Sequence, residues 1–251
     1  MPCGQANRKG YTAVLVSTTT SAVTAPAYAK RGTGHYDLLV VGVCVVIILS
    51  NIGASKGVQI GPLVTDGGFF LFPLAYILGD VISEVYGPKA ARRSIILGFS
   101  AALFAVLTFW AIIALPGFTD DYGLAKQEAL EVALGPVWQI VAASLAGFAV
   151  GQGLNAWVMA SMKRRTQEKH LVARIMGSTG VGEFADTVVF CAIAATAIGI
   201  SGWGQFANYV IVGFLWKTLV EFLMVPVTAK VIGVMKRHEP SYQEALARTE
   251  S

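Results

Sequence analysis

The sequence carries little charge. Only 14% of its 251 residues are Asp, Glu, Lys or Arg, whereas 55% are hydrophobic. A soluble domain carries roughly a quarter charged residues, so this chain lacks the polar surface that a globule in water needs. Cysteine is also scarce, because Cys3, Cys44 and Cys191 are the whole set. They have neither metal-ligand spacing nor a pairing pattern, which argues against a zinc site or a disulfide framework.

Catalytic signatures are missing as well. The chain contains no His-Glu-x-x-His motif, nucleophile elbow or phosphate-binding loop. An intramembrane aspartyl protease needs two acids on facing helices, and Asp80 and Asp186 superficially supply them. The Gly-x-Gly-Asp form of that class is absent, however, because position 77 is Ile. We therefore predict that the protein is not an enzyme and that it uses no metal or other cofactor.

The chain does contain long apolar runs. They lie at about 37–57, 69–86, 93–115, 136–162, 174–200 and 207–234. An α-helix needs about 20 apolar residues to cross a bilayer, so the runs predict an all-α polytopic membrane protein with six transmembrane helices. Residues 35–235 form this domain. Residues 1–34 are small, polar and proline-containing and are predicted to be a disordered cytoplasmic tail, and residues 236–251 form a cytoplasmic C-terminal tail.

Basic residues fall on alternate loops. If the N-terminus is inside, the inner segments hold Arg8, Lys9, Lys30, Arg31, Lys89, Arg92, Arg93, Lys163, Arg164, Arg165, Lys169, Arg174, Lys236, Arg237 and Arg248. The outer segments hold Lys126 alone, beside several acids. This distribution follows the positive-inside rule, so both termini are predicted to be cytoplasmic. Membrane orientation explains the net charge of +4, and no nucleic-acid partner is required.

Ionisable residues nevertheless occur inside the predicted spans, where each costs at least a few kcal/mol. They form three pairs at helical spacing, and the spans also carry amides. The candidates are Asn51, Asp80, Glu84, Gln152, Asn155, Glu183, Asp186, Lys217 and Glu221. Because residues three or four apart share one helix face, each pair is predicted to face a common interior and not lipid.

Structural interpretations remain open for several of these residues. Lys217 and Glu221 are spaced for an ion pair that only holds the sixth helix in register. Glu84 precedes a helix stop, so it could meet water or the nearby arginines, and the amides could form interhelical hydrogen bonds. Asp80 and Glu183 lie deeper and have no cation nearby in the sequence, which makes them the stronger candidates for a solute or a coupling proton.

Glycine patterns suggest interrupted helices in both halves. Gly67-Gly68 favours a break before the second span, and residues 177–183 (GSTGVGE) form a glycine-rich entry to the fifth. An asparagine precedes an acid by 29 residues in the first half and by 28 in the second. The matched spans run in opposite directions, which is compatible with a 3+3 inverted repeat. Interrupted helices in corresponding places point to a site in the middle of the membrane.

The run FPLAYILGDVISEVYGPKAARR (72–93) resembles the signature of the queuosine-precursor transporter family, bacterial membrane proteins grouped with vitamin uptake transporters. Weaker matches follow in the expected order at 50–56, 151–163, 173–190 and 214–232. The resemblance implies uptake of 7-cyano-7-deazaguanine or 7-aminomethyl-7-deazaguanine for tRNA modification. It places Asn51, Asp80, Glu84, Asn155, Glu183, Asp186, Lys217 and Glu221 in or near the transport site. The chain departs from the pattern at Gly151-Gln152-Gly153, where a carboxylate is expected.

The resemblance also implies a bacterial inner membrane protein, with the bilayer and a modified purine base as partners. Transport would be ion-coupled, proton-coupled or facilitative. The alternative is a substrate-binding subunit of an ATP-driven importer of the energy-coupling-factor type, because such subunits are also small six-helix proteins. A homodimer is left open. Carboxylates accept hydrogen bonds only, so they suit the clustered N–H donors of a guanine-like edge or an added ammonium group.

Overall fold

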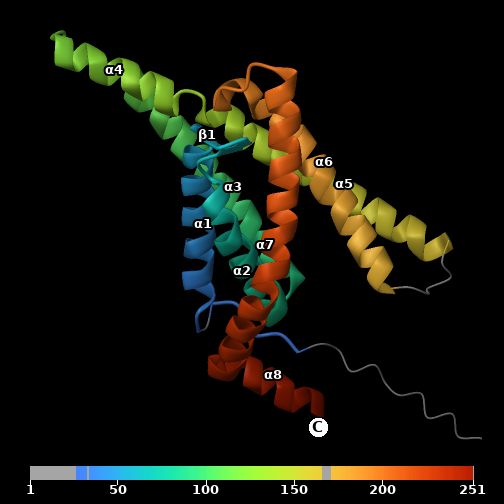
Figure 1. The fold of residues 1–251 in the computed structure, drawn as a ribbon. Coiled ribbons are helices and arrows are strands. Elements are labelled where there is room, and N and C mark those ends of the chain that lie inside the picture. Colours follow the sequence, from blue (N-terminus) through green and yellow to red (C-terminus); the bar gives the residue numbers. More distant parts are fainter. Residues whose placement is uncertain (1–26, 33, 166–170, 251) are drawn as a thin grey trace, which may run out of the picture.

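The computed structural model describes residues 27–32, 34–165 and 171–250, and most of them are helical (Figure 1). The elements are α1 (Tyr36–Gly53), β1 (Gly57–Ile60), β2 (Leu63–Asp66), the 3₁₀ turn η1 (Phe69–Leu71), α2 (Phe72–Tyr86), α3 (Pro88–Ala114), α4 (Asp121–Leu134), α5 (Val137–Arg165), α6 (Leu171–Ile198), α7 (Trp203–His238) and α8 (Pro240–Glu250). Most of the predicted N-terminal tail, residues 1–26, lies outside the described residues.

Five segments in the described part of the chain are long and apolar enough to cross a membrane. They are α1, α3, α4 running on into α5, α6 from Met176, and α7. The remaining predicted span, 69–86, corresponds to α2, whose 15 residues measure about 22 Å, less than the roughly 30 Å hydrocarbon core. The multi-pass, mainly helical architecture agrees with the prediction, but five spans satisfy the length requirement and not six.

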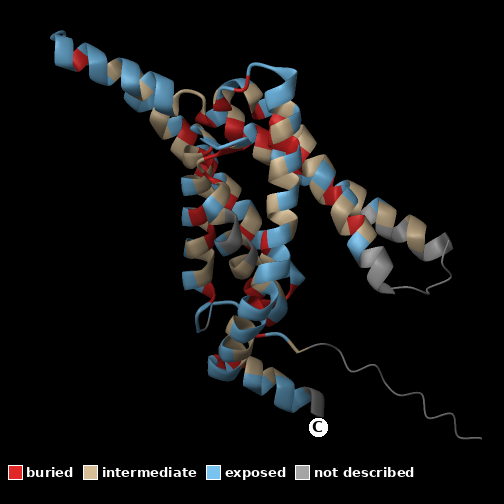
Figure 2. Cartoon of the chain, in the orientation of Figure 1, coloured by how far each residue is buried: buried red, intermediate tan, exposed pale blue. Residues whose placement is uncertain are grey.

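The outward faces of these helices are apolar and exposed (Figure 2). Leu38, Leu103, Phe104, Phe222 and Leu223 each expose more than half of their surface. Soluble monomers rarely expose such continuous apolar surface, whereas lipid covers it in a membrane protein. The exposed apolar faces therefore agree with the composition.

Two packing units meet at α7. In the first, α1, α2 and α3 pack together, with α7 against α2, around a core that includes Tyr36, Val81, Ile82 and Val85. In the second, α5 and α6 pair along their length. Figure 1 shows these two helices running away from α2 and α7 toward the end of α5 and the start of α6.

Glycines let α5 and α6 approach closely. A Cβ atom added to Gly182 would lie 2.8 Å from the carbonyl oxygen of Gly151, and one added to Gly151 would lie 2.8 Å from that of Gly182. Small residues at such contacts are common in membrane helix pairs. The predicted interruption at 177–183 is wrong, because α6 runs unbroken through these residues. The glycines there serve helix packing.

The region between the first two predicted spans holds an unexpected β-hairpin. Strands β1 and β2 pair antiparallel, with Gly57 opposite Asp66. Gly67 follows at a close approach to α1, since a Cβ on it would lie 2.6 Å from the carbonyl oxygen of Gly53. Regular helix begins only at Phe72, after η1. The predicted break at Gly67-Gly68 is therefore confirmed.

Two further helices were not predicted. Asp120 caps α4, its side chain accepting a hydrogen bond from the Gly123 backbone N at 2.8 Å. The predicted C-terminal tail begins within the last turn of α7 and continues as α8. The described end of the N-terminal tail also packs, because Ala29 is buried and its N donates to the carbonyl oxygen of Val85 at 2.8 Å.

Candidate functional site

Helix α7 carries four polar side chains that each face a carboxylate from another element. We call this arrangement the α7 column. Its levels are Tyr209 with Asp66, Lys217 with Asp186, Glu221 with Asp80, and Lys236 with Glu84. From Tyr209 to Lys236 the helix rises about 40 Å, close to the thickness of a bilayer with its headgroups. The Tyr209 level is the hairpin end, and the Lys236 level is the α8 end.

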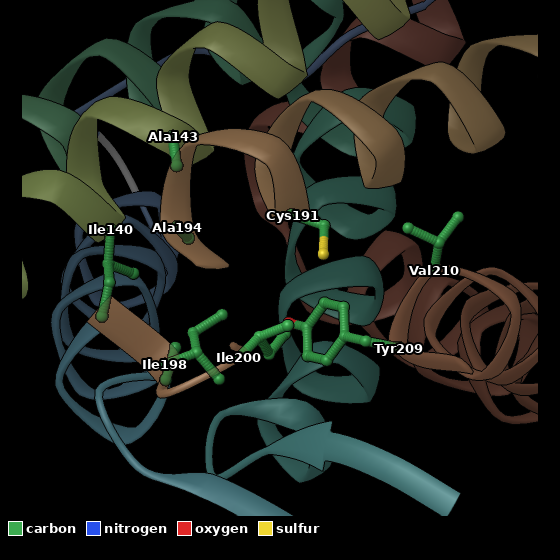
Figure 3. Packing of buried hydrophobic residues seen from close by; sticks show 9 residues of the cluster. Ile140, Ala143, Cys191, Ala194, Ile198, Ile200, Tyr209 and Val210 are labelled. Atoms are coloured by element: carbon green, nitrogen blue, oxygen red, sulfur yellow. The ribbon is translucent and has the colours of Figure 1, made fainter. Parts of the chain in front are cut away.

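At the hairpin end, Asp66 is buried, with 3% of the residue exposed. It accepts hydrogen bonds from the backbone N of Gly68 at 2.7 Å and from the Tyr209 hydroxyl. Tyr209 lies in a buried cluster with Ile198 and Ile200 where α5, α6 and α7 meet (Figure 3). Burial raises the pKa of Asp66, while the two hydrogen bonds and the positive charge of Lys217 oppose this rise.

Sequence reasoning missed Asp66. The residue precedes a Gly-Gly pair outside the apolar runs, so it has the features of an ordinary turn aspartate. No periodic signal marks it as buried, because a two-stranded hairpin of four-residue strands is too short to produce one. Its burial depends on contact with Tyr209, 143 residues later.

One level further along, Lys217 Nζ donates to Asp186 Oδ2 at 2.6 Å. The two side chains are 13% and 26% exposed. Asp186 also packs against α5, since a Cβ on Gly147 would lie 2.5 Å from Asp186 Oδ1. The alternative of an ion pair between Lys217 and Glu221 is wrong, because Lys217 bridges α7 to α6 and the described residues give Glu221 no salt bridge.

The third level differs from the others. The carboxyl groups of Asp80 and Glu221 lie close enough across the α2–α7 contact for like charges on them to repel each other. Within the described part of the chain, no hydrogen bond or ion pair compensates either carboxylate. Asp80 also lines a cavity of about 380 Å³, together with Ser83, Glu84, Ala229 and Ile232. Ligand pockets commonly begin near 300 Å³, so the cavity is large enough for a small solute.

Glu84 and Lys236 form the level at the α8 end, with Lys236 Nζ donating to Glu84 Oε1 at 2.5 Å. The nearby arginines, the partners considered from the sequence, are therefore not needed to explain Glu84. The two side chains are 56% and 26% exposed for Glu84 and Lys236 respectively. Exposed pairs of this kind contribute at most about 1 kcal/mol.

Beyond this level lies the Glu239 junction. The Glu239 side chain is fully buried and accepts hydrogen bonds from the Tyr86 hydroxyl at 2.7 Å, the Ser241 hydroxyl at 2.9 Å and the His35 backbone N at 3.2 Å. Burial acts to raise the pKa of Glu239, but the hydrogen bonds outweigh it and the pKa is lowered. The junction joins α2, the α7–α8 turn and the segment before α1.

Among the predicted amides and acids, Asn51, Asn155 and Glu183 belong neither to the lining of the cavity nor to the α7 column. Asn51 is buried, and its side chain donates to the Ile47 carbonyl oxygen of the same helix at 2.7 Å. It also accepts from the Ser144 hydroxyl at 2.9 Å, and this interhelical hydrogen bond connects α1 to α5. Asn155 and Glu183 lie on the α5–α6 pair, where a Cβ on Gly182 would sit 2.9 Å from Asn155 Cβ. The residues that line the cavity come from α2 and α7.

The arrangement is suited to binding a solute with N–H donors. Paired carboxylates accept hydrogen bonds from adjacent donors and attract a cation. In the described residues, no group of three or more His, Cys, Asp or Glu side chains is placed to hold a metal ion. The α7 column thus offers compensated acids at both ends and uncompensated acids near the middle.

Comparisons with known proteins point to transport. A family model described as "Putative vitamin uptake transporter" matches residues 66–231. A protein of Bacillus subtilis (strain 168), named "Probable queuosine precursor transporter", is 27% identical over 180 residues, which are 71% of this chain and 76% of that protein. No solved structure matches the chain. The matched residues include all four acids that face α7 in the column.

Proposed function

We propose that this chain, which belongs to the vitamin uptake transporter family, imports 7-deazaguanine precursors of queuosine across the bacterial inner membrane. The family and the Bacillus protein are transporters and not enzymes, and several apolar helices make this chain a multi-pass membrane protein. The solutes we propose are 7-cyano-7-deazaguanine and 7-aminomethyl-7-deazaguanine. The proposal is that the chain carries them without a dedicated ATPase.

The observation that supports this proposal best is the Asp80–Glu221 level. A guanine-like edge presents an N–H and an NH₂ group side by side, and one carboxylate accepts both. A carboxylate within a predicted span that the protein itself leaves uncompensated is costly in a membrane, which favours a functional role. We assign Asp80 to the guanine-like edge because it lines the cavity, and Glu221 to the far side of the same solute.

The other predicted residues take supporting roles in this proposal. Glu84 lines the cavity and is held by Lys236, and Asp186 with Lys217 lies in the column on the hairpin side. Asn155 and Glu183 lie on α5 and α6, which we propose to close on the solute during transport. Asn51 supports the site indirectly by holding α1 against α5.

We further propose six crossings with both termini inside. The sixth crossing would be formed by η1 followed by α2, which together cover residues 69–86, because α2 alone is too short to span the bilayer. The hairpin end of the column then faces outward and the α8 end inward. Cysteines introduced at Asp120 and Gln205 should react with an impermeant reagent from outside, and those at Arg164 and Arg237 should not. Reaction of all four from one side would contradict six crossings.

Uptake by the chain alone tests the function. We would express it in bacteria that can neither make nor import the precursors, feed each precursor, and measure queuosine in tRNA. The expected result is incorporation without any added ATPase, with Asp121→Asn as an exposed carboxylate control that behaves like the unchanged protein. Failure with both solutes, despite normal abundance in the membrane, would contradict the proposal. Uptake only with an added energy-coupling ATPase would favour the substrate-binding subunit.

A further inference from the structure

A second ionisable site lies at the hairpin end of the α7 column. Asp66 is buried, yet it takes no part in the cavity beside Asp80. Tyr209, its partner, precedes Glu221 by 12 residues of one helix, a rise of about 18 Å. A solute between Asp80 and Glu221 would therefore not touch Asp66. A buried acid that the solute does not need calls for another explanation.

The hairpin is fastened to α7 by a small set of polar contacts. Asn208 Oδ1 accepts from the Val64 backbone N at 2.8 Å, and Asn208 Nδ2 donates to the Pro62 carbonyl oxygen at 2.9 Å. Trp216 Nε1 donates to the Phe69 carbonyl oxygen at 3.1 Å. Tyr209 adds its hydrogen bond to Asp66. Only this last contact contains a carboxylate, so it is the contact whose strength changes when a proton binds.

The surroundings of Asp66 are well defined. Tyr209 donates to it, Lys217 attracts it electrostatically, and Lys217 is paired in turn with Asp186. The Cys191 thiol lies near Tyr209 in the same buried cluster. Burial raises the pKa of Asp66, so this carboxylate takes up a proton under milder acidity than an exposed aspartate. Hydrogen bonds to an ionised acceptor are roughly twice as strong as neutral ones, so protonation weakens the contact to Tyr209.

We infer that Asp66 is the proton-binding site that couples import to a proton gradient, and that its ionised form holds the hairpin closed over the outer end of the column. The inference rests on the proposed function. A proton from the outer water adds to a carboxylate oxygen of Asp66, the charge attraction to Lys217 ends, and the hairpin loosens from α7. When the proton leaves to the inner water, the carboxylate regains its charge, and the hydrogen bond from Tyr209 closes the hairpin again.

Reconstituted vesicles allow the two parts of this inference to be separated. Counterflow, in which solute outside exchanges with solute inside, requires no gradient and reports transport alone. Accumulation against an inside-alkaline pH gradient reports coupling. We expect the unchanged protein and the exposed control Asp121→Asn to perform both. Asp66→Asn should keep counterflow close to the unchanged rate, and its accumulation should fall to the level seen without a gradient.

Three outcomes would be decisive. Gradient-driven accumulation by Asp66→Asn at the unchanged level would overturn the inference. Counterflow by the unchanged protein without any accumulation driven by the pH gradient would also overturn it, while the proposed function stands. Absence of counterflow in the unchanged protein would contradict the proposed function itself.

A second variant covers the case in which Asp66→Asn fails to reach the membrane. Tyr209→Phe keeps the carboxylate but removes a hydrogen bond that lowers the pKa of Asp66. Without that bond the pKa rises, so the pH profile of accumulation should shift to higher pH. A purely structural role for the bond would lower abundance and leave the profile in place, which would overturn the inference.

Discussion

Acidic residues at the two ends of α7 have hydrogen-bond partners, whereas those near its middle have none in the described residues. At the hairpin end Asp66 is buried and hydrogen-bonded, and near the α8 end Glu239 is buried and accepts three hydrogen bonds. Near the middle, Asp80 and Glu221 face each other with no compensating group in the described residues. Acids with partners hold helices together, whereas acids without partners remain available to a ligand. The contrast separates acids that bind partners within the protein, among them the proton site that we propose at Asp66, from acids that we propose to bind the solute.

The largest effect on stability is expected at the Lys217–Asp186 pair. Lys217→Met leaves the Asp186 carboxylate without its cation in a largely buried place, which costs about 3–5 kcal/mol for a buried pair. Asp186→Asn removes the anion that faces Lys217 and should also lower abundance. The double variant Lys217→Met with Asp186→Leu should recover most of the lost abundance. Quantitative immunoblots of membranes would measure this, and equal losses in single and double variants would contradict an ion pair.

The Glu84–Lys236 pair provides the matched control. It has a similar N–O separation but lies in a more exposed setting. Glu84→Gln should change the unfolding free energy by less than about 1 kcal/mol. A loss as large as that of Asp186→Asn would show that exposure does not separate the two pairs.

An effect smaller than that at the Lys217–Asp186 pair, but dependent on pH, is expected at Glu239. Glu239→Gln leaves its donors poorly matched and should cost about 3 kcal/mol, since charge-assisted hydrogen bonds are lost. Because the folded pKa of Glu239 is lowered, its ionised form stabilises the protein above its ordinary pKa, and this contribution is lost as the pH falls through the lowered folded value. The melting temperature of the unchanged protein should therefore fall more steeply with acidification than that of Glu239→Gln. Parallel curves would contradict the burial of an ionised group.

A smaller effect than at Glu239 is expected from packing between α5 and α6. Gly182→Ala would push a methyl group to within 2.8 Å of the Gly151 carbonyl oxygen and should cost roughly 1–3 kcal/mol. Gly153→Ala is the matched control, because it adds the same methyl group to the same helix pair. Nothing lies within 4 Å of that added atom, so the change should be nearly neutral. Thermal unfolding in detergent compares the two, and equal melting temperatures would show that the glycine contact is not required.

Much of the helical arrangement could be predicted from the sequence. Apolar runs of sufficient length located all the long helices, and Gly67-Gly68 marked the start of the second span. The hairpin and α4 were missed because short polar segments have no strong periodicity. The break expected at 177–183 was wrong because glycines permit both a bend and close helix contact, and only the neighbouring helix decides between them.

The polar residues show the same limit more sharply. Helical spacing identified the acids inside the spans and allowed an ion pair between Lys217 and Glu221, whereas Lys217 pairs with Asp186 on another helix. Asn51 and Ser144 bond across 93 positions in the chain, and Asp66 and Tyr209 across 143. Partners so distant in sequence are brought together by tertiary packing, which the local spacing of residues does not predict. The separation of compensated from uncompensated acids therefore required the structure.

The central claim is that the acids near the middle of α7 bind the solute, whereas the acids at its ends bind partners within the protein. The most direct test measures abundance, melting temperature and precursor uptake together for Asp80→Asn and Glu221→Gln. Removing one of two repelling charges should leave the melting temperature unchanged or raise it, whereas uptake of the precursors should be lost with Asp80→Asn and strongly reduced with Glu221→Gln. Normal uptake by both variants at unchanged stability would contradict the claim, as would a loss of stability equal to that of the Lys217→Met variant.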